Sequence, residues 1–107
     1  MNKSIRVLDL KDNPIGDAGN TALAQALAIN DTVEHLCLRQ TKMTWQAGIE
    51  LGKAMSLNRT LVRVDLRANK IGDTGIGLIA TSLAASKALE YLNVADNQVR
   101  FGFGFPL

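Results

Sequence analysis

The stretch LVRVDLRANKIGDTG, residues 61–75, decides the fold of this chain. Apolar and polar residues alternate at its start, which is typical of a β-strand with one buried face. Asn69 follows where the chain must turn, and its amide can bond backbone groups that would otherwise be buried unpaired. After IGDTG the apolar residues recur with helical spacing. The stretch therefore predicts a strand, a turn and the start of a helix.

The same unit recurs through the chain at a fixed shift of 28 residues, with no gap between copies. Five columns of this self-alignment keep a related residue type over four copies. They are Ile5, Val33, Leu61 and Leu89; Leu8, Leu36, Val64 and Leu92; Leu10, Leu38, Leu66 and Val94; Asn13, Thr41, Asn69 and Asn97; and Ile15, Met43, Ile71 and Val99. Such regularity is very improbable by chance, so the chain is a repeat protein.

Each copy fits the L-x-x-L-x-L-x-x-N-x-L signature of a leucine-rich repeat. We therefore predict an α/β fold, a right-handed leucine-rich-repeat solenoid with parallel strands on its concave side and helices on its convex side. The four strands are expected near residues 6–10, 34–38, 62–66 and 90–94, and the three helices near 17–29, 45–57 and 73–85. One domain spans residues 1–99, with repeats near 5–32, 33–60 and 61–88, a partial repeat at 89–99, and an aromatic tail at 100–107.

The helical segments have stripes of small and aliphatic residues that are expected to face the core. The stripe members are Gly19, Ala22, Leu23, Ala26 and Leu27 in the first helix, Ala47, Leu51, Ala54 and Met55 in the second, and Gly75, Leu78, Ile79, Ser82 and Leu83 in the third. Asn30 and Asn58 stand where helices end, a position that favours a left-handed closing residue. Thr44 is the expected N-cap of the second helix. Thr41 replaces the turn asparagine, so a looser second turn is expected.

The segments IGDAG…ALAQALAIN and IGDTG…LIATSLAAS closely resemble the repeats of ribonuclease-inhibitor-like leucine-rich-repeat proteins. The resemblance covers roughly residues 4–99 and implies that the chain binds a protein through the concave sheet or the adjoining turns. It also extends to the Ran GTPase-activating protein, which suggests regulation of a GTPase by analogy, without matching functional residues. Two places depart from the pattern: MTWQAG puts Trp45 at the start of the second helix, and the fourth repeat ends in RFGFGFPL.

Composition limits the possible function classes. A net charge of +2 is too small to indicate nucleic acid or an anionic membrane as the partner. No segment is apolar enough to span a bilayer, and residues 1–10 lack the apolar core of a signal peptide. A single cysteine, Cys37, cannot form an internal disulfide, which suits a reducing compartment. We therefore predict a cytoplasmic protein with no nucleic-acid or membrane partner.

The outward-facing strand positions form a candidate contact surface for another protein. The residues predicted to bind a partner on the concave face are Asp9, Lys11, His35, Arg39, Arg63, Asp65, Arg67, Tyr91 and Asn93. Parallel strands lie about 4.8 Å apart, so Lys11, Arg39 and Arg67 form a basic column that can dock an acidic surface. Tyr91 is the expected aromatic anchor. The alternative is a solvated surface whose charges are compensated by nearby aspartates.

Catalytic and cofactor chemistry is not predicted at these positions. His35 and Cys37 share a strand face, but a zinc site needs three or four ligands and the chain has no second cysteine or histidine. An open sheet also lacks the oxyanion site that a Cys–His nucleophile requires. GDTGIG, residues 72–77, lacks the lysine and the spacing of a phosphate-binding loop. We therefore predict that the chain is not an enzyme and uses no metal or cofactor.

The C-terminal tail holds all three phenylalanines of the chain, Phe101, Phe103 and Phe105. A solenoid exposes apolar core at its ends, so these rings are expected either to cap the last repeat or to promote self-association. Two functions stay open. The first is a non-catalytic protein–protein interaction module that binds another protein on its concave face. The second is a structural or regulatory segment of a larger repeat protein or self-associating array.

Overall fold

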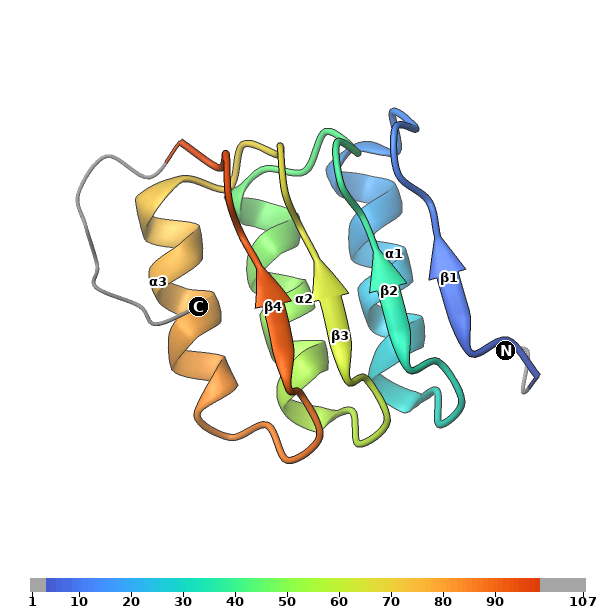
Figure 1. Ribbon diagram of the computed structural model, residues 1–107. Coiled ribbons are helices and arrows are strands. Elements are labelled where there is room, and N and C mark those ends of the chain that lie inside the picture. Colours follow the sequence, from blue (N-terminus) through green and yellow to red (C-terminus); the bar gives the residue numbers. More distant parts are fainter. Residues whose placement is uncertain (1–3, 99–107) are drawn as a thin grey trace.

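The computed structural model describes residues 4–98, and within them strands and helices alternate as predicted (Figure 1). The elements are β1 (Val7–Asp9), α1 (Gly16–Ile29), β2 (His35–Cys37), α2 (Trp45–Leu57), β3 (Arg63–Asp65), α3 (Gly72–Leu83) and β4 (Tyr91–Asn93). The strands form one parallel sheet in the order β1-β2-β3-β4. The helices cover one face of this sheet and leave the other face open (Figure 1). The predicted α/β solenoid is confirmed.

The sequence period sets the strand register. Each strand residue pairs with the residue 28 positions later, so Leu8 lies opposite Leu36, and Leu36 opposite Val64. Each strand has three residues and lies at the centre of its predicted segment. α1 and α2 match their predicted bounds to within one residue, whereas α3 ends at Leu83, two residues earlier than expected. Within residues 4–98, no helix is both long enough and apolar enough to cross a bilayer.

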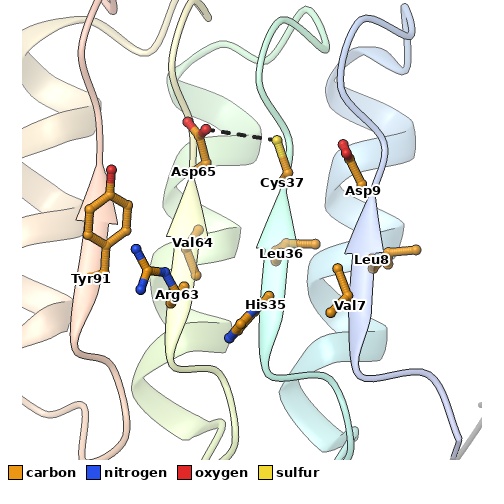
Figure 2. A pocket seen from close by; sticks show the side chains of 10 residues that line it. All are labelled: Val7, Leu8, Asp9, His35, Leu36, Cys37, Arg63, Val64, Asp65 and Tyr91. Atoms are coloured by element: carbon orange, nitrogen blue, oxygen red, sulfur yellow. Dashed lines mark hydrogen bonds between the residues drawn. The ribbon is translucent and has the colours of Figure 1, made fainter.

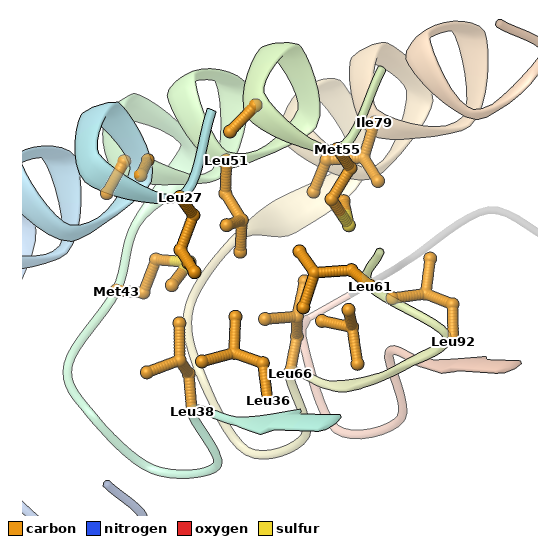
Figure 3. Packing of buried hydrophobic residues seen from close by; sticks show 14 of the residues in the cluster. Leu27, Leu36, Leu38, Met43, Leu51, Met55, Leu61, Leu66, Ile79 and Leu92 are labelled. Atoms are coloured by element: carbon orange, nitrogen blue, oxygen red, sulfur yellow. The ribbon is translucent and has the colours of Figure 1, made fainter. Parts of the chain in front are cut away.

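A continuous apolar core fills the space between the sheet and the helices (Figure 3). The sheet side contributes Leu36, Leu38, Val64 and Leu66, and the helices contribute Leu27, Leu51, Met55 and Ile79. Each of these side chains is at most 2% exposed. Burial of one aliphatic side chain of this size stabilises a protein by about 1.5–3 kcal/mol. Burial of the apolar residues of the strand alternation is therefore a main source of stability.

The predicted core-facing stripe is correct for α2 and partly wrong for the other two helices. All four stripe residues of α2 are buried. In α1, Ala22 is exposed and the polar Asn20 is buried, because a buried asparagine gives no hydrophobic signal in the sequence. In α3, Leu78 is 43% exposed and Ile76 is buried. Apolar residues lie on several sides of α3, so their spacing alone does not identify the face that packs.

The asparagines of the turn column link neighbouring repeats. Nδ2 of Asn69 donates to the carbonyl of Leu66 in its own repeat at 3.0 Å and to that of Leu38 in the preceding repeat at 2.9 Å. Its Oδ1 accepts from the N–H groups of Thr41 and Met43, both at 3.0 Å. Asn69 is buried, so these bonds satisfy backbone groups that have little access to water. The role predicted for this column is confirmed.

Thr41 lacks the amide, and a residue of α1 compensates. The Thr41 hydroxyl donates to the carbonyl of Leu38 at 2.9 Å. The buried Asn20 donates from Nδ2 to the carbonyl of Gly16 at 2.9 Å and to that of Thr41 at 3.4 Å. Thr41 is fully buried, so the second turn stays packed against the core. The sequence pattern did not include this second asparagine, and the looser turn stays a prediction.

Asn30 and Asn58 end their helices in an extended conformation, with φ of −75° and −70°. The predicted left-handed closing residues are therefore wrong. Oδ1 of Asn58 accepts from the N–H groups of Thr60 and Leu61, both at 2.7 Å. Its Nδ2 donates to the carbonyls of Leu27 at 2.8 Å and Asn30 at 2.9 Å, both in the preceding repeat. The Asn58 side chain thus bonds two N–H groups that follow its own helix and two carbonyl groups at the end of the preceding helix.

Left-handed backbone occurs instead in the turns that lead into the helices. One left-handed residue recurs in every turn, with φ between 53° and 63°: Asp12, Gln40, Ala68 and Asp96. A second one alternates between two positions, Gly16 and Gly72 in the first and third turns and Lys42 and Gln98 in the second and fourth. Thr44 stands in the second turn where the first and third have glycine, and β-branched residues disfavour positive φ. The turns therefore come in two alternating forms.

Thr44 is the N-cap of α2, as predicted, because its hydroxyl oxygen accepts from the N–H of Gln46. Asp17, in the first turn of α1, accepts from the N–H of Thr44 at 2.7 Å and also from its hydroxyl. This pair ties the start of α1 to the start of α2.

Candidate functional site

The open face of the sheet, which is the predicted concave side, is hollowed across all four strands (Figure 2). The hollow is lined by Val7, Leu8, Asp9, His35, Leu36, Cys37, Arg63, Val64, Asp65 and Tyr91. Successive residues of a strand point to opposite sides, so alternate positions form rows on this face. One row consists of Val7, His35, Arg63 and Tyr91, and the next consists of Asp9, Cys37, Asp65 and Asn93.

Two of the three residues in the predicted basic column have a carboxylate partner two positions earlier in the chain. Nε of Arg67 lies 3.0 and 3.1 Å from the two carboxylate oxygens of Asp65, and its Nη2 lies 2.7 Å from Oδ2. Nζ of Lys11 lies 3.6 Å from Oδ2 of Asp9. The charges of Lys11 and Arg67 are therefore compensated within the protein, as the alternative of a self-compensated surface proposed.

These contacts lower the pKa of both aspartates, which are ionised at neutral pH. The backbone N–H of Lys11 and, to a smaller degree, its ammonium group lower the pKa of Asp9 below the usual range. Partial burial acts to raise the pKa of Asp65, but hydrogen bonds from the side chain and the N–H of Arg67 outweigh it and hold that pKa low. The open face therefore carries two fixed negative charges, each next to a basic partner.

Arg39 differs from Lys11 and Arg67 because Cys37 stands where the neighbouring strands have aspartate. Arg39 is exposed, and within residues 4–98 it forms no salt bridge. His35, on the same strand, is also exposed and has no carboxylate partner among those residues. The charge of Arg39 still lowers the pKa of Asp65 on the neighbouring strand, but β2 contributes one guanidinium and one imidazole that form no salt bridge within residues 4–98.

The Cys37 thiol is a weak hydrogen-bond donor rather than a reactive group. Its Sγ lies 3.9 Å from Oδ2 of Asp65 (Figure 2). Burial raises the pKa of the thiol, and the negative charges of Asp65 and Asp9 raise it further. At neutral pH the sulfur therefore stays protonated, and a protonated thiol is a poor nucleophile and metal ligand. Within residues 4–98, no group of three or more His, Cys, Asp and Glu side chains could hold a metal ion.

Arg63 and Tyr91 form the aromatic end of the hollow. The Arg63 guanidinium carbon lies 4.6 Å from the centroid of the Tyr91 ring, a cation–π contact (Figure 2). Nδ2 of Asn93 donates to the Tyr91 hydroxyl at 3.2 Å. Tyr91 nevertheless remains 42% exposed, and Val7 at the other end of the row is 63% exposed. The row therefore offers ordered aromatic, basic and apolar surface to the solvent.

The structure places the predicted strand residues on one face. Asp9, His35, Arg63, Asp65 and Tyr91 line the hollow itself. Asn93 belongs to the same sheet row as Asp9, and Lys11, Arg39 and Arg67 follow directly where the strands end. Phe101, Phe103 and Phe105 lie outside the described residues.

The predicted binding residues leave out four residues of this face and its adjoining turns, although the strand alternation already places Val7 and Cys37 on the open face. Val7 and Cys37 line the hollow. Lys42 and Lys70 are exposed in the turns that follow β2 and β3. The 28-residue alignment contains the signal for both lysines, because they occupy equivalent positions of consecutive repeats. Because both lysines lie in turns, the strand alternation does not predict the direction of their side chains.

Comparison with known proteins gives matches over most of the chain. The family model described as Leucine Rich repeat matches residues 2–24 and 57–80. The chain is 34% identical to the NACHT, LRR and PYD domains-containing protein 3 of Mus musculus over 83 residues, which cover 77% of this chain and 8% of that protein. It is 35% identical to the ribonuclease inhibitor of Sus scrofa over 97 residues, which cover 89% of this chain and 21% of the inhibitor. The chain thus spans a small part of each relative's length.

A solved structure of the leiomodin-1 actin-binding site 2 is similar in fold. The two superimpose with a TM-score of 0.76, over 90% of this chain and 54% of the other. Their sequences are 22% identical, so this similarity concerns the fold alone.

Proposed function

Because this chain is a leucine-rich-repeat protein with repeats like those of ribonuclease inhibitor, we propose that it is a non-catalytic module that binds a partner protein on the open face of its sheet. Solenoids of stacked repeats typically provide extended concave binding surfaces. The observation that carries the proposal is the row of Val7, His35, Arg63 and Tyr91, in which exposed apolar, basic and aromatic groups border one hollow. Arginine and tyrosine are enriched among the residues that dominate binding energy at interfaces.

The charges of the open face favour an acidic partner. Lys11 and Arg67 are paired with carboxylates, whereas Arg39 and Arg63 form no salt bridge in the described part of the chain. An acidic group of the partner that reaches this face supplies the missing counter-charge. The interaction is therefore expected to weaken as ionic strength rises. The single cysteine fits a reducing compartment, and we propose that the interaction takes place in the cytoplasm.

Site-specific crosslinking in cells tests where the partner sits. A photoreactive amino acid replaces Val7 on the open face in one variant and the exposed Gln25 of α1, on the helical side, in another. We expect a defined adduct with one protein from position 7 and none from position 25. Adducts that form equally from both positions, or from position 25 alone, would contradict the proposal.

Affinity measurements with the purified partner then test the role of the basic residues. The double substitution Arg39→Glu/Arg63→Glu is expected to weaken binding at least about tenfold, because two unpaired positive charges become negative. Lys53→Glu is a control for one charge reversal elsewhere, since Lys53 lies on α2 and pairs with Glu50. An unchanged affinity in the double variant would reject the assigned surface.

A segment of a larger repeat array is the second candidate function, and the N-terminal end favours it. Oδ1 of Asn69 and of Asn97 accepts backbone N–H groups from the preceding repeat. The equivalent Asn13 uses its Nδ2 within its own turn, and among residues 4–98 no donor bonds its Oδ1. Ile5, at the same end, is 41% exposed. These are the groups through which a further repeat would stack.

Light scattering over a wide range of protein concentration distinguishes the two candidates. A mass that rises with concentration would support the array, because the ends would then associate with each other. A constant monomer mass would support the interaction module.

A further inference from the structure

The turns that lead from the strands into the helices lie along one edge of the molecule (Figure 1). Their charges are distributed unevenly. The second and third turns, residues 39–44 and 67–72, contain no acidic residue and carry Arg39, Lys42, Arg67 and Lys70. The first and fourth turns each contain an aspartate, Asp12 and Asp96. Because Arg67 is paired with Asp65, the positive charge without a salt bridge in the middle of this edge comes from Arg39, Lys42 and Lys70.

Trp45 comes directly after the second turn, at the start of α2. It is the only tryptophan of the chain, and it is 49% exposed. α1 and α3 have an aspartate in their first turn, Asp17 and Asp73, whereas α2 has no acidic residue there. α2 therefore has no acidic side chain of its own in its first turn, and the carboxylate that bonds its N-cap, Asp17, comes from α1.

The hydrogen bonding seen at the equivalent position of the first repeat does not explain a tryptophan here. Asp17, its equivalent in the first repeat, bonds Thr44 of the next turn. The third turn has Gly72 in place of that threonine, so position 45 has no matching hydroxyl to bond. A Cβ on Gly75 would lie 3.0 Å from Cβ of Trp45. α3 thus contacts the base of the tryptophan side chain, while half of the residue stays exposed.

Lys42 and Lys70 lie on neighbouring turns next to this tryptophan. The N–H of Lys70 donates to the carbonyl of Met43 at 2.8 Å, and Lys70 forms a parallel bridge with Thr44. Within residues 4–98, neither lysine forms a salt bridge. Like charges in adjacent positions repel each other unless a counter-charge is present. A half-exposed tryptophan and two exposed lysines without a salt bridge therefore belong to neighbouring segments of one edge of the molecule.

We propose that Lys42, Trp45 and Lys70, which we call the turn patch, bind an acidic peptide segment that carries one bulky apolar side chain. Carboxylates of the segment pair with the two ammonium groups, and the apolar side chain covers the indole. This inference rests on the proposed function, because it assigns a second contact region and a chemical character to the same class of partner.

Fluorescence of the single tryptophan tests the turn patch directly. The intact chain is titrated with a short synthetic peptide in which glutamates surround one phenylalanine. We expect a saturable shift of Trp45 emission to shorter wavelength, which disappears at high salt because the attraction is partly electrostatic. The same peptide with glutamine in place of glutamate should give no saturable shift. A response to single-stranded oligonucleotide that exceeds the response to the acidic peptide would overturn the proposal.

Charge variants give a second readout, the anisotropy of a labelled acidic peptide. Lys42→Glu/Lys70→Glu is expected to weaken binding at least about tenfold. Trp45→Asp, which introduces the residue found in the first and third repeats, is expected to weaken it as well. Lys53→Glu/Lys87→Glu carries the same charge change away from these turns and should keep the wild-type affinity. If Lys42→Glu/Lys70→Glu also keeps that affinity, the turn patch is not the binding site.

The two proposals can fail separately. If the peptide does not bind while partner binding still depends on Arg39 and Arg63, only the turn patch is wrong. If the peptide binds through Lys42 and Lys70 but no adduct forms from position 7, the turn patch stands and the open-face function is wrong.

Discussion

At the scale of single residues, one cysteine changes the electrostatics of the open face. Asp9 and Asp65 each hold the basic residue that follows two positions later. Cys37 occupies the equivalent position of β2 and carries no charge to offer Arg39. The exchange therefore leaves Arg39 without a salt bridge in residues 4–98 and places a protonated thiol between two carboxylates.

The pKa of Cys37 gives a direct test of this environment. Because burial and the charges of Asp65 and Asp9 raise this pKa, the thiolate should form only at a higher pH than in an unstructured peptide. The rate of alkylation measured against pH should therefore have a raised midpoint. Asp65→Asn removes one negative charge and should lower that midpoint. A midpoint at or below that of a free cysteine would contradict this account.

Two asparagines of the same column should differ sharply in their contribution to stability. Asn69→Ala removes an amide that bonds the backbone of two repeats, and it is expected to lower the free energy of unfolding by about 3 kcal/mol. Asn13→Ala, at the exposed end of the column, should cost less than about 1 kcal/mol. Urea unfolding of both variants measures the difference, and equal losses would argue against the inter-repeat role.

The sequence alone predicts which residues share the open face, because the strand alternation and the 28-residue period fix the position of each backbone unit. It does not predict how their side chains pair. The bidentate contact of Arg67 with Asp65 and the stacking of Arg63 on Tyr91 depend on the side-chain rotamers of these residues. Each of these side chains has several neighbours that it could contact instead. The use of this face for binding therefore remains a prediction.

At the scale of elements, one of the two turn forms requires glycine at a position with positive φ. Gly72 has φ of +73°, and a Cβ there would meet no atom within 4 Å, so substitution is costly for conformational reasons alone. Gly72→Ala is expected to destabilise the chain by about 1 kcal/mol. Gly72→Asn is the control, because asparagine tolerates the left-handed region better and should cost less. Thermal unfolding compares the two, and a larger loss for asparagine would contradict the explanation.

Helix positions follow from the sequence more reliably than helix orientation does. The change from two-residue to helical spacing locates α1 and α2 to within one residue. The buried face of α1 is misassigned because Asn20 is polar yet lies inside, where it bonds the turn that Thr41 leaves incomplete. Such a compensation between two repeats is a tertiary contact that local periodicity does not contain.

At the scale of the whole molecule, stability should be highest in the centre. Within residues 4–98, helix contacts join only α1 to α2 and α2 to α3. α2 is therefore packed on both sides and should exchange its amide hydrogens at least about tenfold more slowly than α1 or α3. Hydrogen exchange followed by mass spectrometry measures this gradient. Uniform protection across the three helices would mean that the chain opens only as a single unit.

The two alternating turn forms also determine how such a molecule can grow by duplication. Glycine, threonine and glycine follow one another at Gly16, Thr44 and Gly72, so the same turn returns after 56 residues, twice the repeat length of 28. A tandem copy of residues 16–71 would preserve this order, whereas a copy of residues 16–43 would place two glycine turns side by side. The longer insertion is expected to give the higher thermal midpoint, measured by circular dichroism. The unit that can be duplicated without changing the order of the turns is then a pair of repeats.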